Sequence, residues 1–122
     1  MNRWALSAGI ALLALGGCKP EVTSHQLLAK SLEAEYGPGT KANVGTLHNE
    51  RHLIVHLQTP QFAAVPDSLL ALFARQVGRV ALQRYHGVKQ LDSLSVAFVE
   101  FTGQGVSFRN PKQADFSVSD LR

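Results

Sequence analysis

The spacing of hydrophobic and polar positions changes several times along the chain, and each spacing predicts a different element. Residues 67–86 carry apolar side chains every three or four positions, which predicts a long helix with one apolar side. Residues 52–57 and 94–101 are rich in β-branched and aromatic side chains, which predicts two strands, the second apolar on both faces. Residues 5–15 form an uncharged apolar run that is too short to span a membrane, because a spanning helix needs about 20 residues.

Capping residues mark the starts of two helices. Thr23 and Gln26 form a capping box, in which each side chain binds an unpaired backbone amide, and this predicts a first helix over residues 23–36. Asp67 or Ser68 is expected to cap the long helix in the same position.

The strands are expected to form two hairpins. A loop at Asn49 and Glu50 pairs Leu47 with His52, and a turn over residues 102–105 pairs Phe101 with Val106. The first hairpin then has Val44, Leu53, Val55 and Leu57 on one face and Leu47, His52, Ile54 and His56 on the other. The second has Ala97, Val99, Phe101, Val106 and Phe108 on one face and Val96, Phe98, Glu100, Ser107 and Arg109 on the other, with Glu100 paired diagonally to Arg109.

The element order α-β-β-α-β-β predicts a small single α+β domain with a mainly antiparallel sheet packed against one long helix. The tail alternates at Phe116 and Val118 and is a candidate edge strand. We expect the sheet face opposite the long helix to carry Leu47, Ile54, Val96 and Phe98 and to be covered by the first helix. The alternative is that the first helix stays near the tether and leaves this face open.

The start of the chain has the features of an export signal. Arg3 precedes the apolar run at residues 5–15, and two small residues then lead to Cys18. The sequence Leu15-Gly16-Gly17-Cys18 resembles the lipobox of bacterial lipoproteins. The alternatives are an ordinary secretory signal with a coincidental cysteine and a buried N-terminal helix.

The lipobox resemblance implies cleavage between Gly17 and Cys18 and acylation of Cys18. Residues 1–17 would be the removed signal peptide, residues 18–22 a tether and residues 23–122 the globular domain. The acyl chains on Cys18 would attach the protein to the membrane of the cell envelope. Lys19 follows the cysteine, and by the same resemblance this favours the periplasmic side of the outer membrane over the inner membrane in a host with two membranes.

Composition excludes several classes of function. Cys18 is the chain's single cysteine, so the domain that follows it has neither a disulfide nor a thiolate metal site. The chain carries 12 Lys and Arg against 9 Asp and Glu, and the excess falls to two without Arg3. This balance does not call for nucleic acid as a partner.

Three histidines, His48, His52 and His56, repeat every four residues. This spacing would align metal ligands on a helix, but the residues between them favour a strand. On a strand His52 and His56 share a face about 13 Å apart, too far for one ion, and His48 falls on the opposite face. Surface histidines are therefore the favoured interpretation, and a metal site is the alternative.

Catalytic motifs are missing from the sequence. There is no G-x-S-x-G elbow and no free thiol, and the carboxylates occupy polar positions. We predict no catalytic residue, no bound metal and no cofactor, and the balance favours a non-enzymatic function.

A contact surface is the remaining candidate. Leu72 and Leu82 flank Arg75 and Arg79 on the polar face of the long helix, an arrangement that suits a protein interface or, more weakly, anionic lipid head groups; a solvated face is the alternative. Ile54 and Phe98 on the sheet complete the predicted partner surface. The sequence therefore predicts a membrane-anchored binding or scaffolding module, with an envelope protein as partner. The alternative is a tethered enzyme or metal-binding protein that uses His48, His52 and His56.

Overall fold

The computed structural model describes residues 23–110 and 112–122, and the predicted signal peptide and tether lie outside this range. The long elements and their bounds are α1 (Ser24–Tyr36), β2 (Lys41–Leu47), β3 (His52–Gln58), α2 (Leu70–Arg84), β4 (Ser93–Thr102), β5 (Gly105–Phe108), β6 (Ala114–Ser117) and α3 (Val118–Leu121). Short 3-10 helices connect them at Pro60–Phe62, Asp67–Leu69 and Val88–Gln90.

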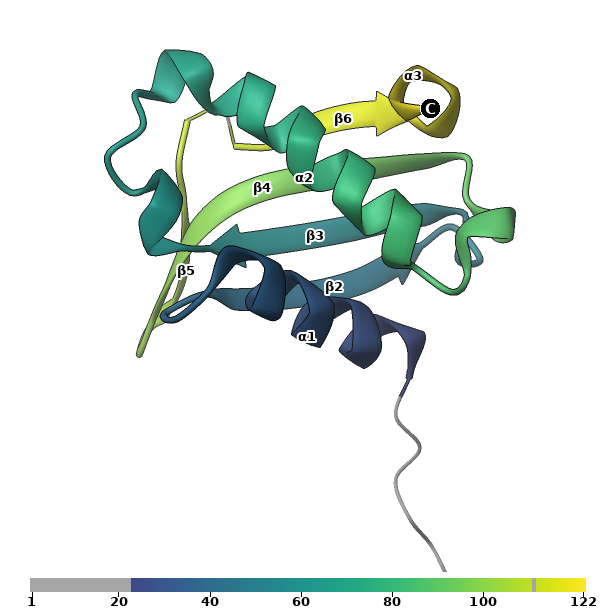
Figure 1. The fold of residues 1–122 in the computed structure, drawn as a ribbon, viewed down its shortest axis with the longest axis horizontal. Helices are drawn as coiled ribbons and strands as arrows, with labels where there is room; N and C mark the ends of the chain where they lie inside the picture. Colours follow the sequence, from purple (N-terminus) through teal and green to yellow (C-terminus); the bar gives the residue numbers. More distant parts are fainter. Residues whose placement is uncertain (1–22, 111) are drawn as a thin grey trace, which may run out of the picture.

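The strands form a five-stranded sheet in the order β2-β3-β4-β5, and β6 also pairs with β4 (Figure 1). β3 and β4 are parallel because α2 carries the chain back across the sheet, and the other pairings are antiparallel. The amides of Arg109 and Val118 donate to the carbonyl oxygens of Phe98 and Asp92, which point to the same edge of β4. β5 and β6 therefore share that edge, and the α+β class with a mainly antiparallel sheet is confirmed.

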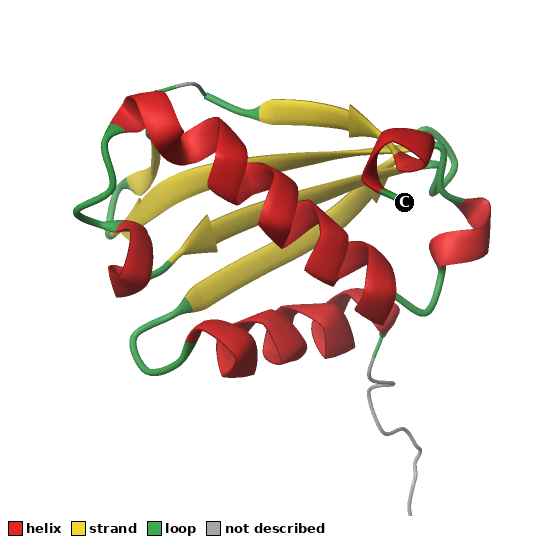
Figure 2. Ribbon diagram, turned by 45° about the horizontal axis from the view of Figure 1, so that its top comes forward, coloured by secondary structure: helices red, strands yellow, loops and turns green. Residues whose placement is uncertain are grey.

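Both long helices cover the same face of the sheet, so the domain has two layers (Figures 1 and 2). Leu28 and Leu32 of α1 and Val77 of α2 are buried against Leu53 and Leu94 in one core. The expectation that the first helix covers the opposite face is wrong. Strands lie about 4.8 Å apart and a helix is about 10 Å wide, so one helix is too narrow for this sheet and α1 covers the part that α2 leaves.

The parallel register decides which side chains share a face. Leu53 lies opposite Leu94, Val55 opposite Val96 and Leu57 opposite Phe98, so all six belong to the helix-covered face. The predicted registers within both hairpins are confirmed. The grouping of Val96 and Phe98 with Ile54 on the other face is wrong.

The predicted start of α1 is confirmed and that of α2 is not. Thr23 Oγ1 accepts from the amide of Gln26, whose side chain accepts from the Thr23 amide. At α2, a 3-10 turn over Asp67–Leu69 precedes the helix, and neither this turn nor α2 receives a side-chain cap. The Asp67 carboxylate instead accepts from Arg109 Nη2 at 2.9 Å.

Candidate functional site

The face of the sheet opposite α1 and α2 is the main candidate site, and we call it the open face. Its side chains come from alternate positions of each strand, as the strand registers require. Leu47, Val106 and Phe108 on it are exposed by 50%, 42% and 44%. The open face comprises Lys41, Asn43, Gly45, Leu47, His52, Ile54, His56, Gln58, Ser93, Ser95, Ala97, Val99, Phe101, Val106, Phe108, Asp115 and Ser117.

One part of the open face is apolar. Phe101, Val106 and Phe108 lie where β4 and β5 pair, and Ala97 and Val99 are buried beside them. The His56 ring packs edge-on against Phe108 with centroids 5.1 Å apart. Burial lowers the pKa of His56, so this imidazole is neutral at pH 7 and adds no charge to the patch.

The other part of the open face carries a chain of hydrogen bonds. His52 Nδ1 lies 2.6 Å from Ser93 Oγ, and His52 Nε2 lies 2.7 Å from Ser95 Oγ. Ser95 Oγ donates in turn to Asp115 Oδ1 at 2.5 Å, and Gln113 Nε2 donates to the same oxygen at 2.9 Å. Ser95 is 2% exposed, so this network is anchored in the sheet.

The structure confirms the predicted positions of two of the three histidines and contradicts the third. His52 and His56 share the open face, as predicted. His48 lies in the turn with its ring centroid 6.3 Å from that of His52, so its predicted position on the opposite face is wrong. The turn residues 48–50 have positive φ angles, which carries this side chain out of strand alternation. Within the described residues, no three His, Cys, Asp or Glu side chains gather as metal ligands.

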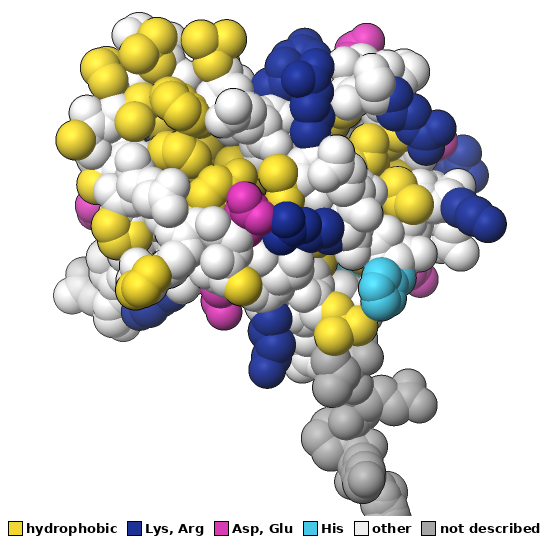
Figure 3. Space-filling model, in the orientation of Figure 1, with side chains coloured by type: hydrophobic (Ala, Val, Ile, Leu, Met, Phe, Trp, Pro, Cys, Tyr) yellow, Lys and Arg dark blue, Asp and Glu magenta, His cyan; other side chains and the backbone are white. Residues whose placement is uncertain are grey.

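The predicted partner surface does not assemble as a unit. Leu72 and Arg79 are exposed on α2, and Leu82 is buried. Arg75 donates to the backbone oxygen of Asp120 and lies over the Phe116 ring, so α3 and β6 occupy it. Exposed hydrophobic side chains do gather over the start of α2 (Figure 3), where Leu69 and Leu72 are exposed.

Ile54 and Phe98, the two sheet residues of the predicted partner surface, lie on opposite faces of the sheet. Ile54 is part of the open face, whereas Phe98 is 5% exposed in the core beneath the helices. The prediction that they lie together is wrong, because it assumed the opposite phase between the two hairpins.

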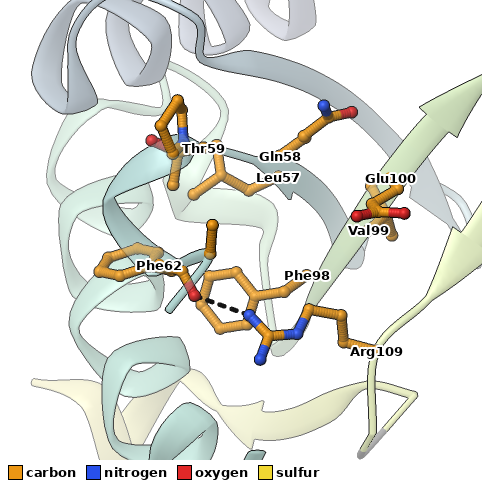
Figure 4. A pocket seen from close by; sticks show the side chains of 10 residues that line it. Leu57, Gln58, Thr59, Phe62, Phe98, Val99, Glu100 and Arg109 are labelled. Carbon is orange, nitrogen blue, oxygen red and sulfur yellow. Dashed lines mark hydrogen bonds between the residues drawn. The ribbon is translucent and has the colours of Figure 1, made fainter. Parts of the chain in front are cut away.

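A pocket of about 370 Å³ lies at the end of β3 and is lined by Leu57, Phe62, Phe98 and Val99 with polar groups at its sides (Figure 4). Arg109 Nη1 donates to the Phe62 carbonyl at 2.6 Å, and Nη2 donates to Val65 and Asp67. The predicted Glu100–Arg109 pair is therefore not formed. This arginine holds the loop before α2 in place, and three of its five N–H groups donate to that loop.

Comparisons with known proteins leave the function to be argued from these side chains. The chain matches no protein-family model, and searches of curated proteins and of solved structures find no significant similarity. In residues 23–110 and 112–122, no helix has the length and apolar character needed to cross a membrane.

Sequence reasoning missed Ser93 and Ser95 as partners of His52, and Asp115 as the partner of Ser95. They come from β4 and β6, and the register of three strands is needed to bring them to His52. The available signal was the alternation of serines at positions 93 and 95, which put two hydroxyl groups on one face of an otherwise apolar strand.

Proposed function

We propose that this chain is a lipoprotein of the bacterial envelope whose domain binds a protein partner through the open face. The anchor would be Cys18, at the end of the sequence Leu15-Gly16-Gly17-Cys18. Stable attachment needs more than one acyl chain, and two or three chains on this cysteine meet that condition. With Lys19 next to it, the outer membrane is the proposed location in a host with two membranes.

The observation that carries the binding proposal is that neither α1 nor α2, the long helices of the described residues 23–110 and 112–122, covers the open face. Exposed apolar patches on monomeric proteins are often contact sites. Val106 and Phe108 of this patch are already about half-buried, so burying the remainder contributes roughly 1.5–3 kcal/mol. A micromolar complex needs about 8 kcal/mol, so the partner must also bind polar members of the face.

Membrane anchoring would compensate for the small binding free energy of the apolar patch. Two proteins held at one membrane surface meet at a raised effective concentration, which increases occupancy without new contacts. The proposed anchor and the modest apolar patch therefore support the same function.

The alternative that uses three histidines together receives no support from the side-chain positions. His56 packs against Phe108, while His52 is occupied by Ser93 and Ser95. We therefore do not propose a metal site.

The test is chemical crosslinking in native membranes followed by identification of the captured protein. We expect one stoichiometric partner, which Phe108→Glu removes because the substitution places a charge in the apolar patch. Leu72→Glu is the matched control on the exposed side of α2, where the leucine is 66% exposed. Loss of the partner with Leu72→Glu alone, or no partner for the unaltered protein, would contradict binding through the open face.

The anchor has a separate test. Cys18→Ser should abolish palmitate labelling and release the protein from the membrane fraction. Persistent labelling would show that the acyl chains are attached to another residue.

A further inference from the structure

The hydrogen-bond chain on the open face has a direction, which follows from which groups can donate. The Asp115 carboxylate accepts, so the Ser95 hydroxyl gives its proton to Asp115. Ser95 Oγ then accepts from His52, which places a proton on His52 Nε2. A neutral imidazole with Nε2 protonated has a free lone pair on Nδ1, and Ser93 must donate its hydroxyl proton there.

With the protons placed in this way, the four side chains have the arrangement of a nucleophilic site. A nucleophilic hydroxyl needs a base within about 2.6–3.2 Å, and the base needs a third group that fixes its tautomer. Ser93 Oγ and His52 Nδ1 are 2.6 Å apart, and Ser95 with Asp115 fixes the tautomer from the other side of the ring. The buried Ser95 also limits rotation of the imidazole.

The surroundings leave room for a small substrate. Ser93, His52 and Asp115 line an open groove of about 510 Å³ together with Leu47, His48 and Gln113. His48 lies on the groove wall, and so does Gln113, whose amide donates one of its two N–H groups to Asp115 and keeps the second. Such N–H groups are the kind of donor that stabilises an oxyanion. Leu47 is half-exposed and offers an apolar contact for an acyl group.

We propose that Ser93 is a nucleophile activated by His52 and that the groove cleaves small carboxylic esters. Ser93 Oγ forms a bond to the acyl carbon while His52 Nδ1 takes its proton. The bond from the acyl carbon to the alcohol oxygen breaks, and that oxygen leaves with the proton from Nδ1. Water then attacks the acyl-serine, giving a proton to Nδ1, and Ser93 Oγ recovers it as the carboxylic acid leaves.

The roles of the other residues follow from this scheme. His52 is the base, and Ser95 and Asp115 are positioning residues because they act through the imidazole. This activity goes beyond partner binding and uses the polar part of the open face, whereas the proposed partner contact centres on Phe108.

The experiment treats the full-length protein in solubilised membranes with a fluorophosphonate, which forms a covalent bond with activated serines, and locates the adduct by mass spectrometry. Hydrolysis of p-nitrophenyl acetate is measured in parallel. We expect an adduct on Ser93 that Ser93→Ala removes, and a labelling rate at least about 100-fold lower in His52→Ala, since a general base typically contributes 10²–10⁴. Ser107→Ala, an exposed serine on β5, should change neither measurement.

Asp115→Asn keeps the proposal testable if His52→Ala unfolds, because Asp115 is exposed and the amide has nearly the same volume. It should lower kcat for the ester with little change in KM and no loss of melting temperature. Absence of an adduct on Ser93, or labelling of Ser93 no faster than of Ser107, would overturn the proposal. So would an unchanged rate in both His52→Ala and Asp115→Asn. Each of these results is separate from partner capture, which Phe108→Glu tests.

Discussion

The position of α1 over the core makes a quantitative prediction for Leu32→Ala. Leu32 is fully buried with Leu28 beneath α1, and it belongs to the same cluster as Leu53 and Val77. Replacing a buried leucine by alanine costs about 2–5 kcal/mol, from lost burial and from the cavity that remains. The free energy of unfolding should therefore fall by at least about 2 kcal/mol.

The matched control for this substitution is Leu27→Ala in the same helix. Leu27 is 41% exposed, so its truncation should cost only about 1 kcal/mol, while the change in helix propensity is the same. Unfolding by urea, followed by circular dichroism, gives both free energies. In a domain of this size, 1 kcal/mol corresponds to about 4–8 °C in melting temperature, so Leu32→Ala should melt at least about 8 °C lower.

Equal effects of the two substitutions would refute the packing argument. They would mean that α1 does not contribute its Leu32 side to the core, and the two-layer arrangement would lose its support. The open face would then regain α1 as a possible cover, and the binding proposal would lose its main observation.

Three further substitutions test local features. Gly39→Ala should lower the unfolding free energy by about 1–3 kcal/mol in a urea titration, because Gly39 has φ +84° and an added Cβ would lie 2.9 Å from Pro60 Cγ. Gly45→Ala is the control, because nothing lies within 4 Å of a Cβ added there. Thr23→Ala should cost about 0.5–2 kcal/mol by removing the capping box, and no change in the melting curve would contradict this. Burial lowers the pKa of His56 in the folded state, so the unfolded state binds more protons below about pH 6.5 and the free energy of unfolding falls as pH falls. His56→Gln should flatten the dependence of this free energy on pH between about pH 7.5 and 5. An unchanged dependence would exclude His56 as its cause.

Features set by neighbouring residues were predictable from the sequence. The Thr23 capping box, the pairing of Leu47 with His52 and the pairing of Phe101 with Val106 all depend on contacts close in the chain. The errors concern contacts between distant segments. Arg109 pairs with Asp67 rather than Glu100, which required knowing where the loop before α2 lies.

The composition of the open face depends on one such long-range relation, the phase of β3 against β4. A shift of one residue in this parallel pair would exchange the two faces of β4, moving Val96 and Phe98 out of the core. Both faces of β4 are apolar enough near its centre to leave this choice open from the sequence alone. Ser95 distinguishes the two registers. In the observed register its hydroxyl bonds to His52 and Asp115. In the other register the hydroxyl would lie in the apolar core under α2. Burying an unpaired hydroxyl there costs about 1–3 kcal/mol. The hydrogen bonds of Ser95 therefore favour the observed register, and this register also puts the apolar patch on the open face.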